Sequence, residues 1–206
     1  MTDLPYPLIL ASASPRRCQL LRTADYEFTV LPPMLDEPAT PSMPVVAAAA
    51  WAEAMAYFKA RSVALNNPEA IIIGADTIVN HNGTIIGKAK DETDARRILT
   101  TVFAGTSEVI TGLTVLCPRQ EKRVITHEKT TIIMRPMTEQ ELEDYIAAST
   151  WRDKAGAYAI QEGHDKFLQS ISGSESNVVG LPMEKLKKVL AMFQKQENGA
   201  SRPKCK

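Results

Sequence analysis

The sequence predicts an α/β fold, and three stretches carry that prediction. Leu8–Leu10 is a short apolar run that passes through small hydroxylated residues into a helix start at Ser14, which is the pattern of a strand followed by a helix. Ala70–Gly74 is continuously apolar, as expected of a strand buried on both faces. Ser107–Leu116 and Lys122–Met134 are rich in β-branched residues and are joined by a short turn, which predicts a long antiparallel pair.

The start of the first helix is a candidate anion site. Ser14 is a favourable N-cap, and Pro15 suits the first helical position because its missing N–H would be unpaired there. Backbone N–H groups and the positive end of the helix dipole would then lie at the tip of the first strand. Arg16 and Arg17 add forked donors that match phosphate oxygens. The same residues also fit an ordinary capped helix that carries two solvated arginines.

The next segments predict a second strand over Tyr26–Leu31, a proline-rich loop, and a helix over Val45–Leu65. The loop carries the adjacent acids Asp36 and Glu37, which in such a loop are usually solvated. Lys59 lies near the C-terminal end of the helix, where a cation suits the helix dipole. A structural role is therefore a sufficient explanation of Lys59 at this point.

Asp76 is the first acid with a suggestive position. The apolar strand is expected to end in Ala75-Asp76-Thr77, which places the acid directly after a buried strand, where open α/β sheets hold their ligands. A turn or capping residue would stand at the same place. Asn82-Gly83 predicts a tight hairpin that returns Lys88 towards Asp76. An acid and a lysine brought together in this way are more specific than either residue alone.

The second half of the chain contains clear helix signals and two loop-like segments. Thr138 and Glu141 form a capping box. Trp151–Gln161 mixes small and aromatic residues, which suggests backbone close to a ligand, and Ser170–Pro182 is expected to be a Gly/Ser-rich loop. Helices are expected over Asp91–Leu99, over Glu139–Ala147 and from Met183 to about Lys195.

Composition and charge limit the functional classes. The chain of 206 residues has 24 Lys and Arg against 24 Asp and Glu, so a general nucleic-acid or membrane-surface binder is not expected. Three cysteines without metal-ligand spacing indicate a reducing compartment. The longest apolar stretch, Val45–Met55, is too short to span a bilayer, so a soluble, cytoplasmic protein is expected. No pair of histidines has ligand spacing, which favours surface or structural roles for His81, His127 and His164.

Five motifs, taken together and in order, resemble the Maf family of nucleoside triphosphate pyrophosphatases. They are Ser-Ala-Ser-Pro-Arg-Arg (12–17), Gly-Ala-Asp-Thr-Ile-Val (74–79), Gly-Lys (87–88), Lys-Ala-Gly-Ala-Tyr-Ala-Ile-Gln (154–161) and Ser-Asn-Val-Val-Gly-Leu-Pro (176–182). The resemblance implies a mixed, elongated β-sheet flanked by helices, as in the inosine triphosphatases, with a nucleotide cleft between two lobes. One such domain is expected over residues 1–195, and the composition of 196–206 predicts a flexible tail. The implied reaction is hydrolysis of a nucleoside triphosphate to the monophosphate and pyrophosphate with a divalent metal, Mg²⁺ or Mn²⁺.

The resemblance assigns roles to ten residues of this sequence. Those expected to hold the triphosphate are Ser12, Ser14, Arg16 and Arg17. Those expected to take part in catalysis are Asp76, which would orient or deprotonate water, and Lys59 and Lys88, which would neutralise phosphate charge. The expected metal ligands are Glu37 and Asp76, and the positions that match the branch acting on dTTP and UTP are Thr77 and Gln161.

Two departures and two alternatives accompany the resemblance. Ala89 replaces the proline that usually follows the Gly-Lys pair, and the stretch Phe103–Val109 is one residue shorter than usual, which affects the local strand register. Many family members are homodimers and were first linked to inhibition of septum formation. A nucleotide-binding regulator of cell division is therefore the first alternative to an enzyme, and a nucleic-acid-binding module is the second. Zero net charge and the lack of a basic-aromatic stripe count against the second.

Overall fold

A computed structural model describes residues 4–34, 38, 47–103, 105–152, 154, 156–158 and 165–194. Their centre is a mixed sheet of seven strands in the order β2-β1-β3-β5-β6-β7, with β4 paired to β3 as a branch. The pairs β2-β1 and β1-β3 are parallel, and the other pairs are antiparallel. The strands are β1 (Leu8–Leu10), β2 (Thr29–Val30), β3 (Ile71–His81), β4 (Thr84–Ile86), β5 (Thr106–Cys117), β6 (Lys122–Met134) and β7 (Leu168–Ser172).

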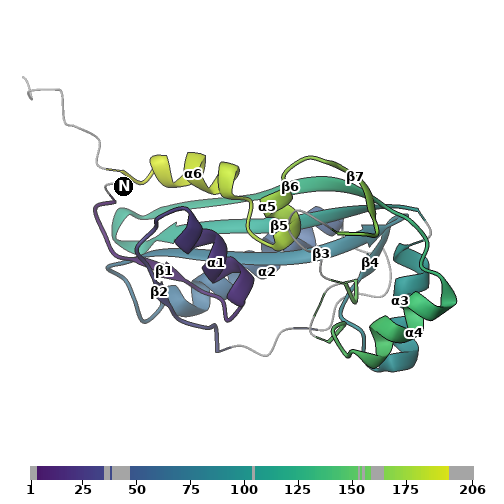
Figure 1. Ribbon diagram of the computed structural model, residues 1–206. Helices are drawn as coiled ribbons and strands as arrows, with labels where there is room; N and C mark the ends of the chain where they lie inside the picture. The colour runs from purple at the N-terminus through teal and green to yellow at the C-terminus, as the bar shows by residue number, and fades with distance from the viewer. Residues whose placement is uncertain are drawn as a thin grey trace, which may run out of the picture.

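Helices cover both faces of the sheet and one of its ends (Figure 1). One face carries α2, and the opposite face carries α1, α5 and α6. The helices α3 and α4 pack on each other and on the far ends of β3, β5 and β6. The helices are α1 (Pro15–Thr23), α2 (Ala48–Ala64), α3 (Glu92–Val102), α4 (Glu139–Ala147), α5 (Glu175–Val179) and α6 (Met183–Ala191), with the 3₁₀ turn η1 (Pro118–Gln120).

The helix α2 lies unusually close to the sheet because glycines face it. A Cβ built on Gly112 would overlap the carbonyl group of Ala52, and one on Gly74 would lie 2.8 Å from Cβ of Ala60. The facing helix positions are themselves alanines that are fully buried. Small residues on both elements therefore let the two backbones approach, and this approach sets how far a side chain of α2 reaches over the sheet.

Several local predictions are confirmed. The hairpin after β3 has Asn82 and Gly83 at φ 50° and 80°, as a type I′ turn requires. The capping box of Thr138 and Glu141 is present, and α4 has the expected bounds. Arg135 and the Thr138 amide hold the pKa of Glu141 down at about 2. The expected disturbance of strand register near 103–109, by contrast, is not found: β5 and β6 pair without a shift from Thr106 and Ile133 onwards.

Other predictions need correction. The strand with Asp76 does not end at Ala75-Asp76-Thr77 but continues to His81, because β5 pairs with it without interruption from Ile72 to Asn80. The segment Ser170–Pro182 is not a loop: it contains the end of β7 and the helix α5, which begins after the N-cap Ser174. The strand β2 is only two residues long. The expected tail over 196–206 lies outside the described residues.

Candidate active site

A cleft of about 730 Å³ opens where one edge of β3 changes partner. On this edge β1 pairs with β3 as far as Ile73, and β4 pairs with β3 from Val79 onwards. Within the described part of the chain, residues 74–78 have no strand partner on this side, whereas β5 pairs with them on the other. The gap separates one lobe, which holds β1, β2 and α1, from a second lobe, which holds β4, α3 and α4 (Figure 1). Both lobes thus share β3 as their floor.

All predicted site residues that the structure describes line this cleft. They are Ser12, Ser14, Arg16, Arg17, Lys59, Asp76, Thr77 and Lys88. Glu37 and Gln161 lie outside the described residues. The hairpin does return Lys88 to the cleft that holds Asp76, as its spacing predicts.

The N-terminus of α1 faces the cleft, and Ser14, Arg16 and Arg17 of this end line it. Ser14 occupies the N-cap and Pro15 the first turn, but the Ser14 side chain makes no capping bond. The first helical bond is donated by the Cys18 amide to Ser14, so the amides of Arg16 and Arg17 precede it. Burial lowers the pKa of Arg16, although a guanidinium stays charged at neutral pH. This end of the helix therefore combines dipole, amides and charge, as the sequence predicts.

Lys59 and Asp76 form an ion pair in the cleft wall. The Lys59 Nζ donates to Oδ1 of Asp76 at 2.7 Å, and the two side chains are 9% and 14% exposed. Lys59 belongs to α2, and Asp76 lies on the face of β3 that α2 covers, together with Gly74. The close approach of α2 to the sheet is what brings the lysine to the acid. The pair orients the carboxylate and leaves Oδ2 as the oxygen not bonded to Lys59.

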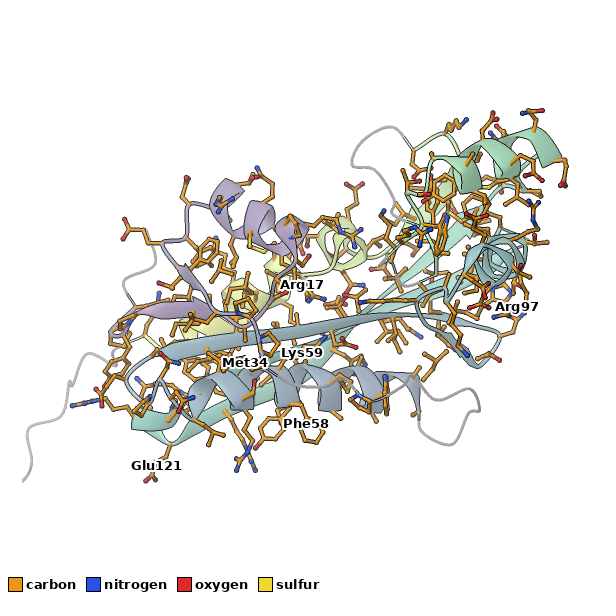
Figure 2. All side chains as sticks on the ribbon, turned by 90° about the horizontal axis from the view of Figure 1, so that it is seen from below. Arg17, Met34, Phe58, Lys59, Arg97 and Glu121 are labelled. Carbon is orange, nitrogen blue, oxygen red and sulfur yellow. The ribbon has the colours of Figure 1, made fainter. Side chains whose placement is uncertain are left out.

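Arg17 is more deeply buried than Arg16, and its side chain is bonded to the protein. Its Nε donates to the carbonyl oxygen of Gly180 at 2.8 Å, and its Nη1 and Nη2 donate to the hydroxyls of Ser12 and Thr77 at 3.1 Å each. Figure 2 shows Arg17 on the α1 side of the sheet and Lys59 on the α2 side. The guanidinium thus links three segments of the cleft by hydrogen bonds. Its contact with phosphate stays a prediction.

The cleft has a cationic part and an apolar part. Among its described lining residues Asp76 is the sole acid, and the cations are Arg16, Arg17, Lys59, Lys88, Arg152 and Lys154. The apolar lining comprises Val79, Val102, Val109, Ile132, Met134, Val178 and Val179, with Tyr158 beside them. Burial and the bond to Asp165 raise the pKa of Tyr158, so its phenol stays neutral. A chain of zero net charge has thus concentrated positive charge beside one apolar surface.

The sequence alone did not single out Arg152, Lys154 and Tyr158 as lining residues. The signal available was the mixture of small and aromatic residues over Trp151–Gln161, which suggested backbone close to a ligand. The described part of that segment does reach the cleft, and the Gly156 amide bonds the carbonyl of Gly87 at 3.0 Å. That bond joins the segment to the turn that carries Lys88.

Fold and cleft together define an α/β protein whose cleft is suited, by its cationic and apolar lining, to a small anion with an apolar portion. The chain belongs to the Maf family, since the family described as Maf-like protein matches residues 7–193. It is 45% identical to a dTTP/UTP pyrophosphatase of Alkaliphilus metalliredigens, covering 89% of this chain and 94% of that protein. It is 38% identical to a dTTP/UTP pyrophosphatase of Moorella thermoacetica, covering 90% and 94%.

A solved structure from Mycobacterium abscessus, titled nucleoside-triphosphatase / dITP/XTP pyrophosphatase, overlaps part of the fold. It covers 69% of this chain and 94% of its own length with a TM-score of 0.42 and 12% identity. No helix among the described residues is long and apolar enough to cross a membrane.

Proposed function

We propose that this protein hydrolyses dTTP and UTP to the monophosphate and pyrophosphate, which clears these nucleotides from the cellular pool. The observation that carries the proposal is the Lys59–Asp76 pair, set in the open edge of β3 and in the same cleft as the N-terminus of α1. The names of the relatives from Alkaliphilus metalliredigens and Moorella thermoacetica support the substrates. A cytoplasmic location is part of the proposal, supported by the free, buried thiols of Cys18 and Cys117. A homodimer stays a prediction.

Different residues of the cleft bind the phosphates and activate the water molecule. The amides at the start of α1, with Arg16 and Lys88, hold the phosphate chain by charge and hydrogen bonds. Lys59 fixes one oxygen of Asp76, so the other can orient a water molecule towards the α-phosphorus and take its proton. Phosphoryl transfer needs mainly positioning and charge stabilisation, which this set of side chains supplies.

The donor set fits a magnesium-type cation. Among the described residues no group of three or more His, Cys, Asp and Glu side chains could hold a metal by itself. Mg²⁺ is commonly held by one or two carboxylates together with substrate phosphates, so Asp76, joined by Glu37, would suffice. When bound, the cation would neutralise phosphate charge and polarise the bond that breaks.

The first prediction concerns the bond that breaks and the need for a metal. With Mg²⁺ or Mn²⁺ the protein should convert dTTP to dTMP and pyrophosphate, and chelation with EDTA should abolish turnover because the Asp76 carboxylate would repel the triphosphate. Ion-exchange chromatography of the products separates this outcome from diphosphate plus orthophosphate. Formation of dTDP would contradict the assignment.

The same assay distinguishes the enzyme from a regulator of cell division. A regulator needs only to bind the nucleotide, so it would show dTTP affinity without turnover at saturating metal and substrate. The placement of Asp76 favours the enzyme, because an acid beside a triphosphate weakens simple binding.

The second prediction concerns the base. Gln161 carries both a donor and an acceptor, so its amide can pair with the O4 and N3–H edge of uracil or thymine. We expect dTTP and UTP to be hydrolysed well ahead of ATP and GTP. Gln161→Ala should reduce the preference for dTTP and UTP over ATP and GTP by about 1–3 kcal/mol, because O4 and N3–H of the base would then lack hydrogen-bond partners. Comparison of kcat/KM over the four nucleotides checks this, and equal values for ATP and dTTP in the unmodified protein would contradict it.

A further inference from the structure

The hydroxyl of Thr77 belongs to a hydrogen-bonded chain that crosses the floor of the cleft. Arg17 Nη2 lies 3.1 Å from the Thr77 hydroxyl oxygen, and that oxygen lies 2.9 Å from the hydroxyl oxygen of Thr111 on the neighbouring strand. The Thr111 hydroxyl lies 3.0 Å from the backbone carbonyl oxygen of Asn177 in α5. Thr77 and Thr111 are directly paired across β3 and β5, so the sheet itself holds them together.

The chemistry of the two ends fixes the direction of every proton in this chain. A guanidinium only donates and a carbonyl oxygen only accepts, whereas a hydroxyl has one proton to give. Thr111 must give its proton to Asn177, so it can only accept from Thr77. Thr77 therefore accepts from Arg17 and donates to Thr111. The carbonyl of Gly180, at 3.5 Å from Thr77, already accepts from Arg17 at 2.8 Å and is the weaker partner.

The carbonyl at the end of the chain is held firmly in place. Asn177 is fully buried, and its Nδ2 donates to the carbonyl of Val109 and to the hydroxyl of Thr130, each at 3.0 Å. Its amide N–H bonds the hydroxyl of the N-cap Ser174. Thr111 is also fully buried, so water does not offer it another acceptor. The folded protein therefore fixes the direction in which each hydrogen bond from Arg17 to Asn177 is donated.

Thr77 lies where the cationic and apolar parts of the cleft meet. It is partly exposed and lines the cleft, and Val79 follows it on the same face of β3. On β5 the partner positions are Thr111 and Val109, so the polar pair is succeeded by an apolar pair. A flat apolar base placed over the valines would turn its polar edge towards Thr77.

We propose that Thr111 is a specificity-determining positioning residue, which makes the Thr77 hydroxyl an acceptor of hydrogen bonds and thereby favours uracil and thymine over cytosine. This inference rests on the proposed function. Ring position N3 is a donor in uracil and thymine and an acceptor in cytosine. A glutamine amide can turn over to satisfy either base, so Gln161 does not separate them by itself. The Thr77 hydroxyl cannot change roles in this way, because it donates its proton to Thr111.

The test compares kcat/KM for UTP and CTP in the wild type and in Thr111→Val. Valine removes the acceptor, so the Thr77 proton becomes available to N3 of cytosine. We expect the UTP-to-CTP ratio to fall by about tenfold or more, mainly because CTP turnover rises. Thr111→Ser restores the acceptor and should restore the ratio. Thr114→Val on the same strand removes a buried hydroxyl for which the described structure shows no hydrogen-bond partner, and it should keep the ratio whatever it costs in stability.

An unchanged ratio in Thr111→Val, or an equal fall in Thr114→Val, would overturn the inference. If Thr111→Val does not fold, Thr77→Val decides instead: it should lower kcat/KM for UTP by about tenfold or more and affect CTP much less. Equal losses for both nucleotides would refute the role of Thr77. Titration calorimetry with the α,β-methylene analogues of UTP and CTP measures the same preference as a ratio of Kd. A preference that appears in binding while no pyrophosphate is released would reject the proposed function alone.

Discussion

Replacing Asp76 with asparagine should reduce kcat by about 100- to 10,000-fold, the usual effect of removing a general base. The variant keeps the size of the side chain and an oxygen for Lys59, but it has no carboxylate to take a proton from water. Because Lys59 would lose its counter-charge in a largely buried setting, we expect a modest fall in Tm rather than unfolding. Pyrophosphate release and a thermal melt should be measured on the same preparation.

A matched control is available on the neighbouring strand. Glu108 of β5 also pairs with a lysine, Lys129, at 2.8 Å, but it is absent from the described cleft lining. Glu108→Gln should therefore cost little stability, as is usual for partly exposed pairs, and leave kcat near the wild-type value. If Asp76→Asn keeps a tenth of its turnover, whatever its Tm, Asp76 is not the general base and the proposed mechanism is wrong.

Replacing Gly112 with alanine should destabilise the protein by about 3 kcal/mol or more, at the upper end for overpacking of a buried site. The new Cβ would overlap the carbonyl of Ala52 and lie 2.6 Å from the amide nitrogen of Glu53. Both are backbone atoms of α2, so no side-chain rotation relieves the overlap and the helix has to move away from β5. Urea unfolding followed by circular dichroism measures the change.

The same variant should lose activity in its folded fraction, since movement of α2 withdraws Lys59 from Asp76. Gly105→Ala is the control: a Cβ there would meet nothing within 4 Å, so its stability and turnover should match the wild type. If Gly112→Ala unfolds at the wild-type urea concentration, the close packing of α2 on the sheet does not determine the position of Lys59.

Sequence determined those features of the protein that depend on neighbours along the chain. Ser14 and Pro15 define the start of α1, and Asn82-Gly83 defines the hairpin that returns Lys88, because caps and tight turns depend on the backbone preferences of a few adjacent residues. The long pair β5-β6 follows from β-branched composition and a short connection. The resemblance of the five motifs supplied the family, which the match over residues 7–193 confirms.

Tertiary structure alone decided how these pieces meet. Asp76 was expected after a strand, yet pairing with β5 extends β3 through it, and a strand's length is set by its partner rather than by its own residues. The sequence explained Lys59 by the helix dipole, and the resemblance gave it a role in neutralising phosphate. Only the contact of α2 with Gly74 and Gly112 shows that it lies against Asp76. No sequence pattern marked Thr111 as a candidate site residue, because the direction of its hydroxyl proton depends on the carbonyl of Asn177, 66 residues further along the chain. Long-range contacts of this kind follow from packing, and packing cannot be read from adjacent residues.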